Sequence, residues 1–147
     1  MGLSHPGAGD AAQAGRLQLT TGTWVSVGTL RLKLVSALSP LATDAVITGH
    51  DRDQIGALVF LSAAGQALPP EQLRRQVAEA LHRLRLDGGG SSQAVGRVLL
   101  TPVPPSADAG EITDKGYVNQ RAVLARRAAD VTVLYTDPED PRVVRAA

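Results

Sequence analysis

Two apolar, β-prone segments followed by a strongly amphipathic helix constrain the fold of this chain more than any other feature. Residues 45–47 and 55–61 are rich in Val, Ile and Leu and are joined by the polar residues 50–54, which predicts an antiparallel pair of strands. Residues 98–100 predict another strand. The helix between them opens at the prolines 69–70 and places apolar side chains on one face, at Leu73, Val77, Leu81 and Leu84. Because such a helix can cross over between parallel strands, we expect a mixed sheet.

The rest of the chain predicts an N-terminal hairpin and two more helices. Residues 17–27 contain two short alternating runs around a Thr-Gly turn, which is typical of a β-hairpin. Residues 30–38 fit either a strand or a helix, and the Ser-Pro sequence after them favours a helix. Apolar residues between 123 and 134 predict a last helix. We therefore expect an α+β domain with a small mixed sheet, an N-terminal hairpin and about three packed helices.

The chain of 147 residues is long enough for one domain with one hydrophobic core. Residues 1–15 are mostly Gly, Ala, Ser and Pro, and they predict a flexible leader. Residues 16–136 are expected to form the folded domain, and residues 137–147 are expected to form a tail.

Composition argues against several classes of function. Lys and Arg total 15 against 14 Asp and Glu, so the net charge of +1 gives no field that recruits nucleic acid or an anionic membrane. Four aromatic residues are too few for base-stacking platforms. No apolar run approaches the roughly 20 residues that cross a bilayer. The chain has no cysteine for a disulfide or a thiolate metal site, and a cytoplasmic location is the expectation.

No motif of a self-sufficient active site is found. The sequence has no Walker-type phosphate loop, no Gly-x-Ser-x-Gly motif and no metal-spaced pair of histidines. His50, Asp51 and Asp53 form a cluster of ligand-type side chains, and a solvated turn is a better interpretation of it than a metal site. The glycines 88–90 resemble a phosphate loop in composition only, and a helix stop is favoured there.

Two further groups of polar residues have a functional and a structural interpretation. Arg121, Arg126 and Arg127 could contact an anionic cofactor, but arginines on an amphipathic helix usually form its solvated face. The polar loop 104–121 carries Lys115, and a loop held by a rigid scaffold can deliver a charge into a neighbouring site. From the residues alone, an exposed lysine ahead of a helix is the favoured interpretation of Lys115.

Three segments, in the same order along the chain, resemble the C-terminal domain of the feruloyl-CoA synthase family. They are residues 21–28 (TGTWVSVG), 45–53 (AVITGHDRD) and 108–124 (DAGEITDKGYVNQRAVL). The resemblance covers residues 15–136 and implies membership of the superfamily of adenylate-forming acyl-CoA synthetases.

The resemblance implies a two-step reaction that this chain cannot complete alone. A carboxylate first reacts with ATP to give an acyl-adenylate and pyrophosphate, and coenzyme A then displaces AMP. A large N-terminal adenylation domain, in the same gene product or on a separate chain, holds the acyl pocket, the magnesium ion and most nucleotide contacts. The small domain acts as a lid that swings about a hinge between two poses. The implied function is therefore the C-terminal lid domain of an acid–thiol ligase for an aromatic carboxylate.

The resemblance also implies roles for particular residues. Lys115 is the implied catalytic lysine of the first pose, and Gly22 and Trp24 are the implied cofactor-binding residues on the CoA side or in the hinge region. ATP and CoA are expected as substrates of the complete enzyme. No metal site and no firmly bound cofactor are expected on this chain.

This sequence departs from the pattern of the wider superfamily at two places. There the lysine usually lies in a Ser-Gly-Lys-Ile sequence, and the aligned residues 109–112 (AGEI) put Glu111 where the lysine belongs. Lys115 follows four residues later and is expected to take over the role, while Glu111 is expected to form no more than an exposed pair with it. The hinge segment, residues 16–19 (RLQL), lacks the acidic residue of the family. A non-enzymatic interaction module that retains the lid fold is therefore the alternative.

Two further expectations concern side-chain environment. Trp24 is expected to be mostly buried, with its indole N–H bonded to an acceptor. The loop around Lys115 is expected to be mobile and accessible, because it has few apolar residues to anchor it.

Overall fold

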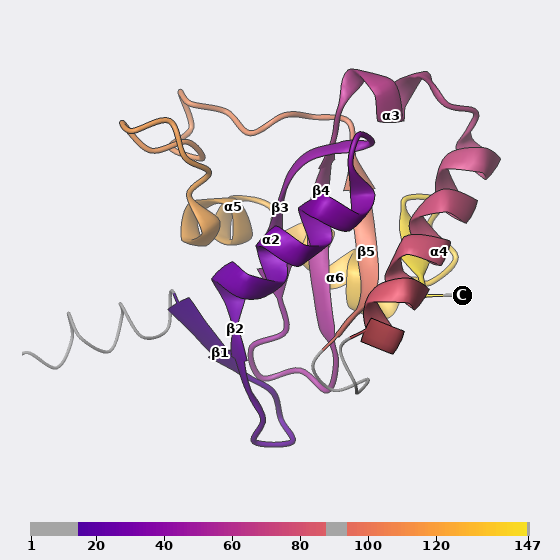
Figure 1. Ribbon diagram of the computed structural model, residues 1–147. Helices are drawn as coiled ribbons and strands as arrows, with labels where there is room; N and C mark the ends of the chain where they lie inside the picture. The colour runs from indigo at the N-terminus through magenta and orange to yellow at the C-terminus, as the bar shows by residue number, and fades with distance from the viewer. Residues whose placement is uncertain (1–14, 88–93, 147) are drawn as a thin grey trace, which may run out of the picture.

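The computed structural model describes residues 15–87 and 94–146, and these residues form the α+β domain that the sequence predicts (Figure 1). Two short strands form an antiparallel hairpin, β1 (Arg16–Gln18) and β2 (Trp24–Ser26). The other strands form a mixed sheet in the order β3-β4-β5-β6. Their bounds are β3 (Ala42–Thr48), β4 (Ile55–Leu61), β5 (Val95–Thr101) and β6 (Val143–Arg145).

The directions of the strands confirm the predicted crossover. β3 and β4 are antiparallel, β4 and β5 are parallel, and β5 and β6 are antiparallel. The chain passes from β4 to β5 through α3 (Ala63–Ala67) and α4 (Pro70–Asp87). The short α3 was not predicted. Most of the predicted leader and the glycine run 88–90 lie outside the described residues, so nothing tests those two expectations.

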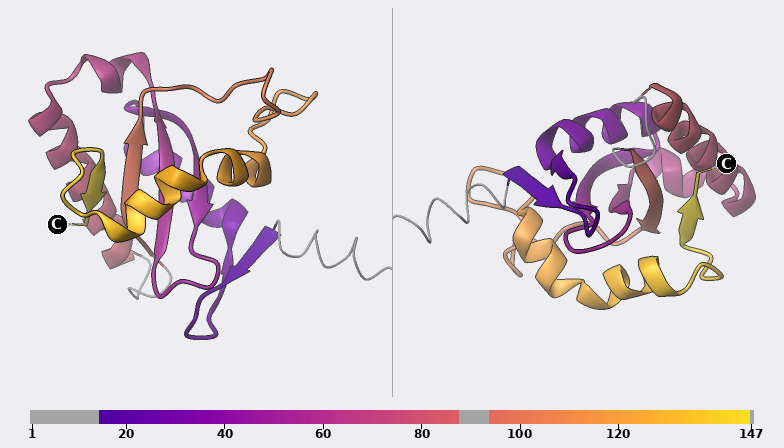
Figure 2. Two further views of the ribbon diagram at one scale, coloured as in Figure 1. Left: turned by 180° about the vertical axis from the view of Figure 1, so that it is seen from behind. Right: turned by 90° about the horizontal axis from the view of Figure 1, so that it is seen from below.

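Helices cover both faces of the sheet (Figure 2). On one face lie α2 (Val27–Leu38) and α4. On the other lie α5 (Gln120–Arg126) and α6 (Ala128–Thr136). The helix predicted at 30–38 is confirmed as α2, which begins after its N-cap Ser26 and ends before the Ser-Pro sequence. No helix of the described residues is long and apolar enough to cross a membrane.

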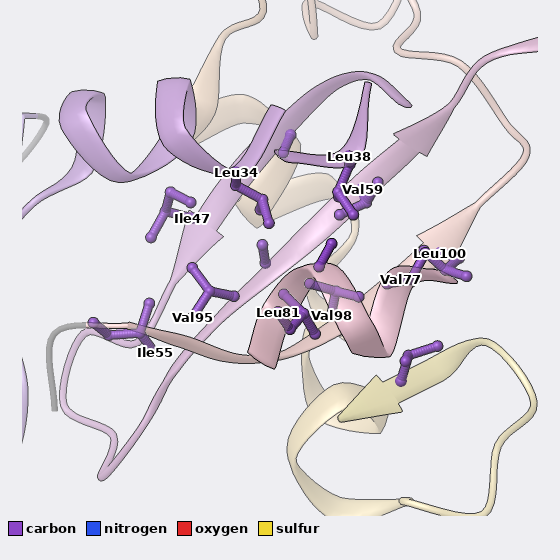
Figure 3. Close-up of a cluster of buried hydrophobic side chains, with 14 of the residues drawn as sticks. Leu34, Leu38, Ile47, Ile55, Val59, Val77, Leu81, Val95, Val98 and Leu100 are labelled. Carbon is purple, nitrogen blue, oxygen red and sulfur yellow. The ribbon is translucent and has the colours of Figure 1, made fainter. Parts of the chain in front are cut away.

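The larger hydrophobic core fills the space between the sheet and the helices α2 and α4 (Figure 3). Leu34 of α2 and Leu81 of α4 are both fully buried and point at the sheet. The predicted apolar face of α4 is confirmed at Leu73, Val77 and Leu81, which are all buried. β4 is buried on both faces, as expected for a central strand between two layers of helices.

The last predicted helix is two helices with a break at Arg127. Arg127 has φ of −105° and ψ of 33°, outside the helical region, and serves as the C-cap of α5 and the N-cap of α6. At this break the side chain of Arg127 points into the domain and is buried. The segment 137–147, expected as a tail, contributes β6, in which Val143 and Val144 are buried against the sheet.

The expectation that Trp24 is buried is wrong, because its side chain is 49% exposed. Successive residues of a strand point to opposite sides, and in β2 the inward position belongs to Val25. Trp24 therefore points outward, where the guanidinium carbon of Arg16 lies 4.8 Å from the centre of its ring.

Candidate functional site

The loop between β5 and α5 ends in a tight hairpin that carries Lys115 at its tip. At the base of the hairpin, the N–H of Asn119 donates a hydrogen bond to the carbonyl oxygen of Glu111 at 2.8 Å. In the turn, Gly116 has φ of +87°, a conformation that residues with a side chain rarely adopt. Lys115 directly precedes this glycine and is exposed to solvent. The sequence Asp-Lys-Gly therefore places the lysine at the point farthest from the base.

Glu111 is a charged residue that is fully buried. Arg127 donates two hydrogen bonds to its carboxylate, from Nε to Oε2 at 2.8 Å and from Nη2 to Oε1 at 3.0 Å. Oε1 also accepts from the backbone N–H of Ser106 at 2.9 Å and from Nη1 of Arg126 at 3.2 Å. A buried carboxylate is tolerated when it is paired and hydrogen-bonded. The expected exposed pair between Glu111 and Lys115 is therefore wrong, because Glu111 faces the interior.

Arg127 is the other half of this pair, and only 9% of it is exposed. Besides its two bonds to Glu111, its guanidinium donates to three oxygens at or just after the end of β5. They are Thr101 Oγ1 at 3.4 Å, the Val103 carbonyl at 3.1 Å and the Pro104 carbonyl at 2.9 Å. A guanidinium has five N–H donors, and all five have an acceptor here. The interpretation of Arg127 as part of a solvated helix face is therefore wrong.

The pKa of Glu111 lies below its ordinary value of 4.5, chiefly because Arg127 donates hydrogen bonds to the carboxylate. Burial acts in the opposite direction, since it disfavours the charged form. The N–H of Ser106 and the charges of Arg127 and Arg126 lower the pKa further. The carboxylate of Glu111 is thus ionised at neutral pH and keeps its partners.

A second anchor holds the other end of the loop. The side-chain amide of Gln120, the first residue of α5, pairs with the backbone of Ile47 in β3. The Ile47 N–H donates to Gln120 Oε1 at 3.1 Å, and Gln120 Nε2 donates to the Ile47 carbonyl at 2.6 Å. Asn119 caps α5 by accepting the Ala122 N–H at 3.2 Å. The loop is thus fixed to the sheet at both ends.

Lys115 has the accessible position that the sequence predicts, and it forms no ion pair with a carboxylate of the described residues. Its expected mobility stays a prediction. The base of the loop, however, is anchored by the buried Glu111 and Arg127 rather than left with little anchorage. Lys115 is thus an unpaired cation on a short arm with a fixed base.

The implied cofactor-binding residues lie in the N-terminal hairpin, away from Lys115. Gly22 is in the hairpin turn with φ of +90°, and a side chain there would meet no atom within 4 Å. Trp24 lies on β2 and is about half exposed, with Arg16 against its ring. Figure 1 shows this hairpin at the bottom of the molecule and the loop 102–119 at the top, and the left view of Figure 2 agrees. The structure therefore does not bring Lys115 together with Gly22 and Trp24.

The polar cluster around His50 holds the N-terminal hairpin on the sheet. His50 Nδ1 accepts the Gln18 N–H at 3.4 Å, and Asp53 accepts the hydroxyl of Thr20. His50 Nε2 lies 3.6 Å from the carboxylate of Asp51. Within residues 15–87 and 94–146, no three His, Asp or Glu side chains are placed to hold a metal ion.

Reasoning from the sequence missed the buried pair of Glu111 and Arg127, although one signal was present. The apolar residues Val123 and Val131 share one helical face, and Arg127 lies midway between them on that same face. An arginine in an apolar stripe has to be paired, and Glu111 is its partner.

Solved structures with a fold similar to that of this chain include adenylation domains of carboxylic acid reductases and a CoA ligase. The adenylation domain of a carboxylate reductase from Mycobacterium chelonae has a TM-score of 0.70 and 20% identity, over 84% of this chain and 20% of that one. The A-PCP didomain of a carboxylic acid reductase from Segniliparus rugosus, in complex with AMP, has a TM-score of 0.68 and 20% identity, over 87% and 19% of the two chains. The anthranilate CoA ligase AuaEII, in complex with anthranoyl-AMP, has a TM-score of 0.55 and 18% identity, over 82% and 21%.

These likenesses show the fold, and the chain spans about one fifth of the length of each of these proteins. No curated protein matches the sequence. Residues 15–139, most of the chain, match the family described as the AMP-binding enzyme C-terminal domain. This chain therefore belongs to the family of AMP-binding enzyme C-terminal domains.

Proposed function

We propose that this chain is the lid domain of an acid–thiol ligase resembling feruloyl-CoA synthase, and that it works together with an N-terminal adenylation domain. The single observation that carries the proposal is the placement of Lys115 within a domain of this family. The lysine is exposed and unpaired at the tip of a hairpin whose base is fixed inside the domain. A cation presented in this way is available to a neighbouring site.

The proposed role of Lys115 follows from the charge that develops during adenylation. A carboxylate oxygen that attacks the α-phosphate of ATP brings two anionic groups together, and an ammonium group placed beside them lowers the barrier. A point charge on a flexible stem suits this task. ATP and its magnesium ion would be held by the N-terminal domain, and CoA would enter in the second step. The proposed substrate is an aromatic carboxylate.

The proposed second pose uses the opposite end of the domain. Gly22 and Trp24 lie in the N-terminal hairpin, and the exposed ring of Trp24 is available for contact with CoA or with the N-terminal domain. Because the hairpin and the Lys115 loop lie at different ends of the molecule, one domain would need two orientations to present both. This separation supports a lid that swings.

The test joins this chain to the N-terminal domain of a feruloyl-CoA synthase and measures each half-reaction separately. Lys115→Ala should slow formation of the acyl-adenylate by about 100-fold or more. It should spare formation of the thioester from preformed adenylate. The matched control is Lys33→Ala, because Lys33 is the other lysine of the chain and lies exposed on α2. This control should leave the adenylation rate unchanged.

The same measurement separates the proposal from its alternative, a non-enzymatic module that retains the fold. The hinge segment supports the alternative, since Arg16 packs on Trp24 instead of an acidic residue standing there. Equal adenylation rates for the unaltered fusion and its Lys115→Ala variant would favour the interaction module. The chain alone, mixed with ferulate and MgATP, should release no pyrophosphate.

A further inference from the structure

Position 111 and position 115 differ in where they point. Glu111 lies at the base of the hairpin with its carboxylate fully buried, whereas Lys115 lies at the tip in solvent. A side chain at position 111 is thus directed into the domain and cannot reach a site on another domain. The outward position, four residues later, belongs to Lys115.

Arg127 joins three parts of the chain. It bonds to Glu111 in the hairpin and to the carbonyls of Val103 and Pro104, and its own backbone forms the junction between α5 and α6. The ring of Phe60 in β4 lies 5.0 Å from its guanidinium carbon. The hairpin base is thereby tied to the rigid sheet.

We infer that Glu111 and Arg127 are positioning residues for Lys115: their buried ion pair fixes the base of the hairpin, and thereby the place at which the lysine is presented. The inference rests on the proposed function of Lys115. Both residues act through the lysine and neither reaches substrate. A displacement of a catalytic group by about 1 Å can cost about 100-fold in rate, so the anchor affects the adenylation step.

Two conservative variants test the anchor without emptying the core. Glu111→Gln keeps the shape of the side chain and removes its charge. Arg127→Lys keeps the charge and loses the planar fork that serves five acceptors. The matched control is Leu81→Ala in α4, on the other face of the sheet, which removes a fully buried side chain. This control destabilises the fold without touching the hairpin.

The first readout is hydrogen exchange of backbone amides in the full chain. The N–H groups of Glu111, Thr113 and Asn119 are hydrogen-bonded within the loop. Both anchor variants should speed exchange at these three amides by about tenfold to a hundredfold, while α4 stays protected. Leu81→Ala should instead speed exchange in α4. Unchanged loop exchange in both anchor variants would overturn the inference.

The second readout is the pair of half-reactions in the fusion described above, measured well below the unfolding temperature of each variant. Glu111→Gln and Arg127→Lys should slow adenylation by about tenfold to a hundredfold and leave thioester formation from preformed adenylate intact. A purely structural role would lower both half-reactions together, as global unfolding does. Equal losses in the two steps would therefore count against positioning.

The inference and the proposed function can fail separately. Full adenylation by Lys115→Ala would refute the proposed function. If Lys115→Ala is inactive while both anchor variants adenylate at the unaltered rate, only the inference is refuted.

Discussion

Replacing Glu111 with alanine should cost the domain about 3–5 kcal/mol of unfolding free energy, because it leaves a charged guanidinium buried without its counter-ion. The structure gives the same magnitude by a second route. Arg127 donates two charge-assisted hydrogen bonds to the carboxylate, at 2.8 and 3.0 Å. Each such bond contributes about 1.5–3 kcal/mol net, so the two together account for about 3–6 kcal/mol. Arg126 is half exposed and adds little.

Urea unfolding followed by far-ultraviolet circular dichroism measures this loss. Tryptophan fluorescence is a poorer probe, since Trp24 is already about half exposed in the folded state. With a slope of about 1–3 kcal/mol per molar urea, the midpoint should fall by about 1 M or more. The matched control is Glu79→Ala, because Glu79 is exposed on α4 and its loss should change stability by no more than about 0.5 kcal/mol.

The refuting result is a Glu111→Ala variant that loses less than about 1 kcal/mol and behaves like Glu79→Ala. It would mean that the carboxylate is solvated in solution and that the hairpin base is free. A double variant, Glu111→Leu with Arg127→Met, tests whether the lost stability comes from the pair of the two residues. It should be more stable than the sum of the single changes predicts, by about 1–3 kcal/mol, because the two residues share one interaction.

Four other changes test further features of the structure. Glu111→Gln should weaken the dependence of the melting temperature on acid pH. The pKa of Glu111 is lowered in the folded state, so its stabilisation is complete above the ordinary value of 4.5 and is lost as the pH falls through the folded-state pKa. Between about pH 6 and pH 2, the melting temperature should therefore fall more steeply for the unaltered chain than for the variant. Gln120→Ala should cost about 1–3 kcal/mol in urea unfolding, because a buried N–H and carbonyl of β3 lose their partner. Gly65→Ala should lower the melting temperature, since its methyl group would meet the carbonyl oxygen of Leu41, whereas Gly28→Ala in α2 meets no atom within 4 Å and should raise stability by about 0.5–1 kcal/mol.

The central layers of the fold could be predicted because each element carries its own periodic pattern. The two strands of the antiparallel pair are apolar runs separated by a polar turn, and α4 has a continuous apolar face opposite its charged one. These patterns fix which side of each element is buried, and burial then fixes the layers. The parallel pairing of β4 and β5 followed from the length of the connection between them.

Three-residue elements could not be predicted in the same way. β6 is too short to show a period, and its place in the sheet depends on pairing with β5, which is more than 40 residues earlier in the chain. In β2, the inward position could belong to Trp24 or to Val25 by composition, and only the register with β1 assigns it to Val25. Short strands take their orientation from their partners.

The environment of the candidate site could not be predicted, because it depends on a contact between residues 16 positions apart. Glu111 and Arg127 belong to a loop and to a helix junction, and neither segment alone shows that their charges meet. Local spacing instead suggested a pair between Glu111 and Lys115, since these residues are four apart. That pair requires a helical turn, and the positive φ of Gly116 makes the segment a hairpin instead.

The outer edge of β3 is closed by side chains rather than by another strand. Gln120 hydrogen-bonds both the N–H and the carbonyl of Ile47. The carboxylate of Asp44 accepts the N–H of Ala45 at 2.8 Å and is itself held by the guanidinium of Arg31 in α2. At the opposite edge, β6 is only three residues long. An extended peptide, or a second copy of the sheet, finds few free amides to pair with at either edge. In the proposed cycle this domain leaves one contact with the N-terminal domain before it makes the next. During that interval, its closed sheet edges protect it from self-association.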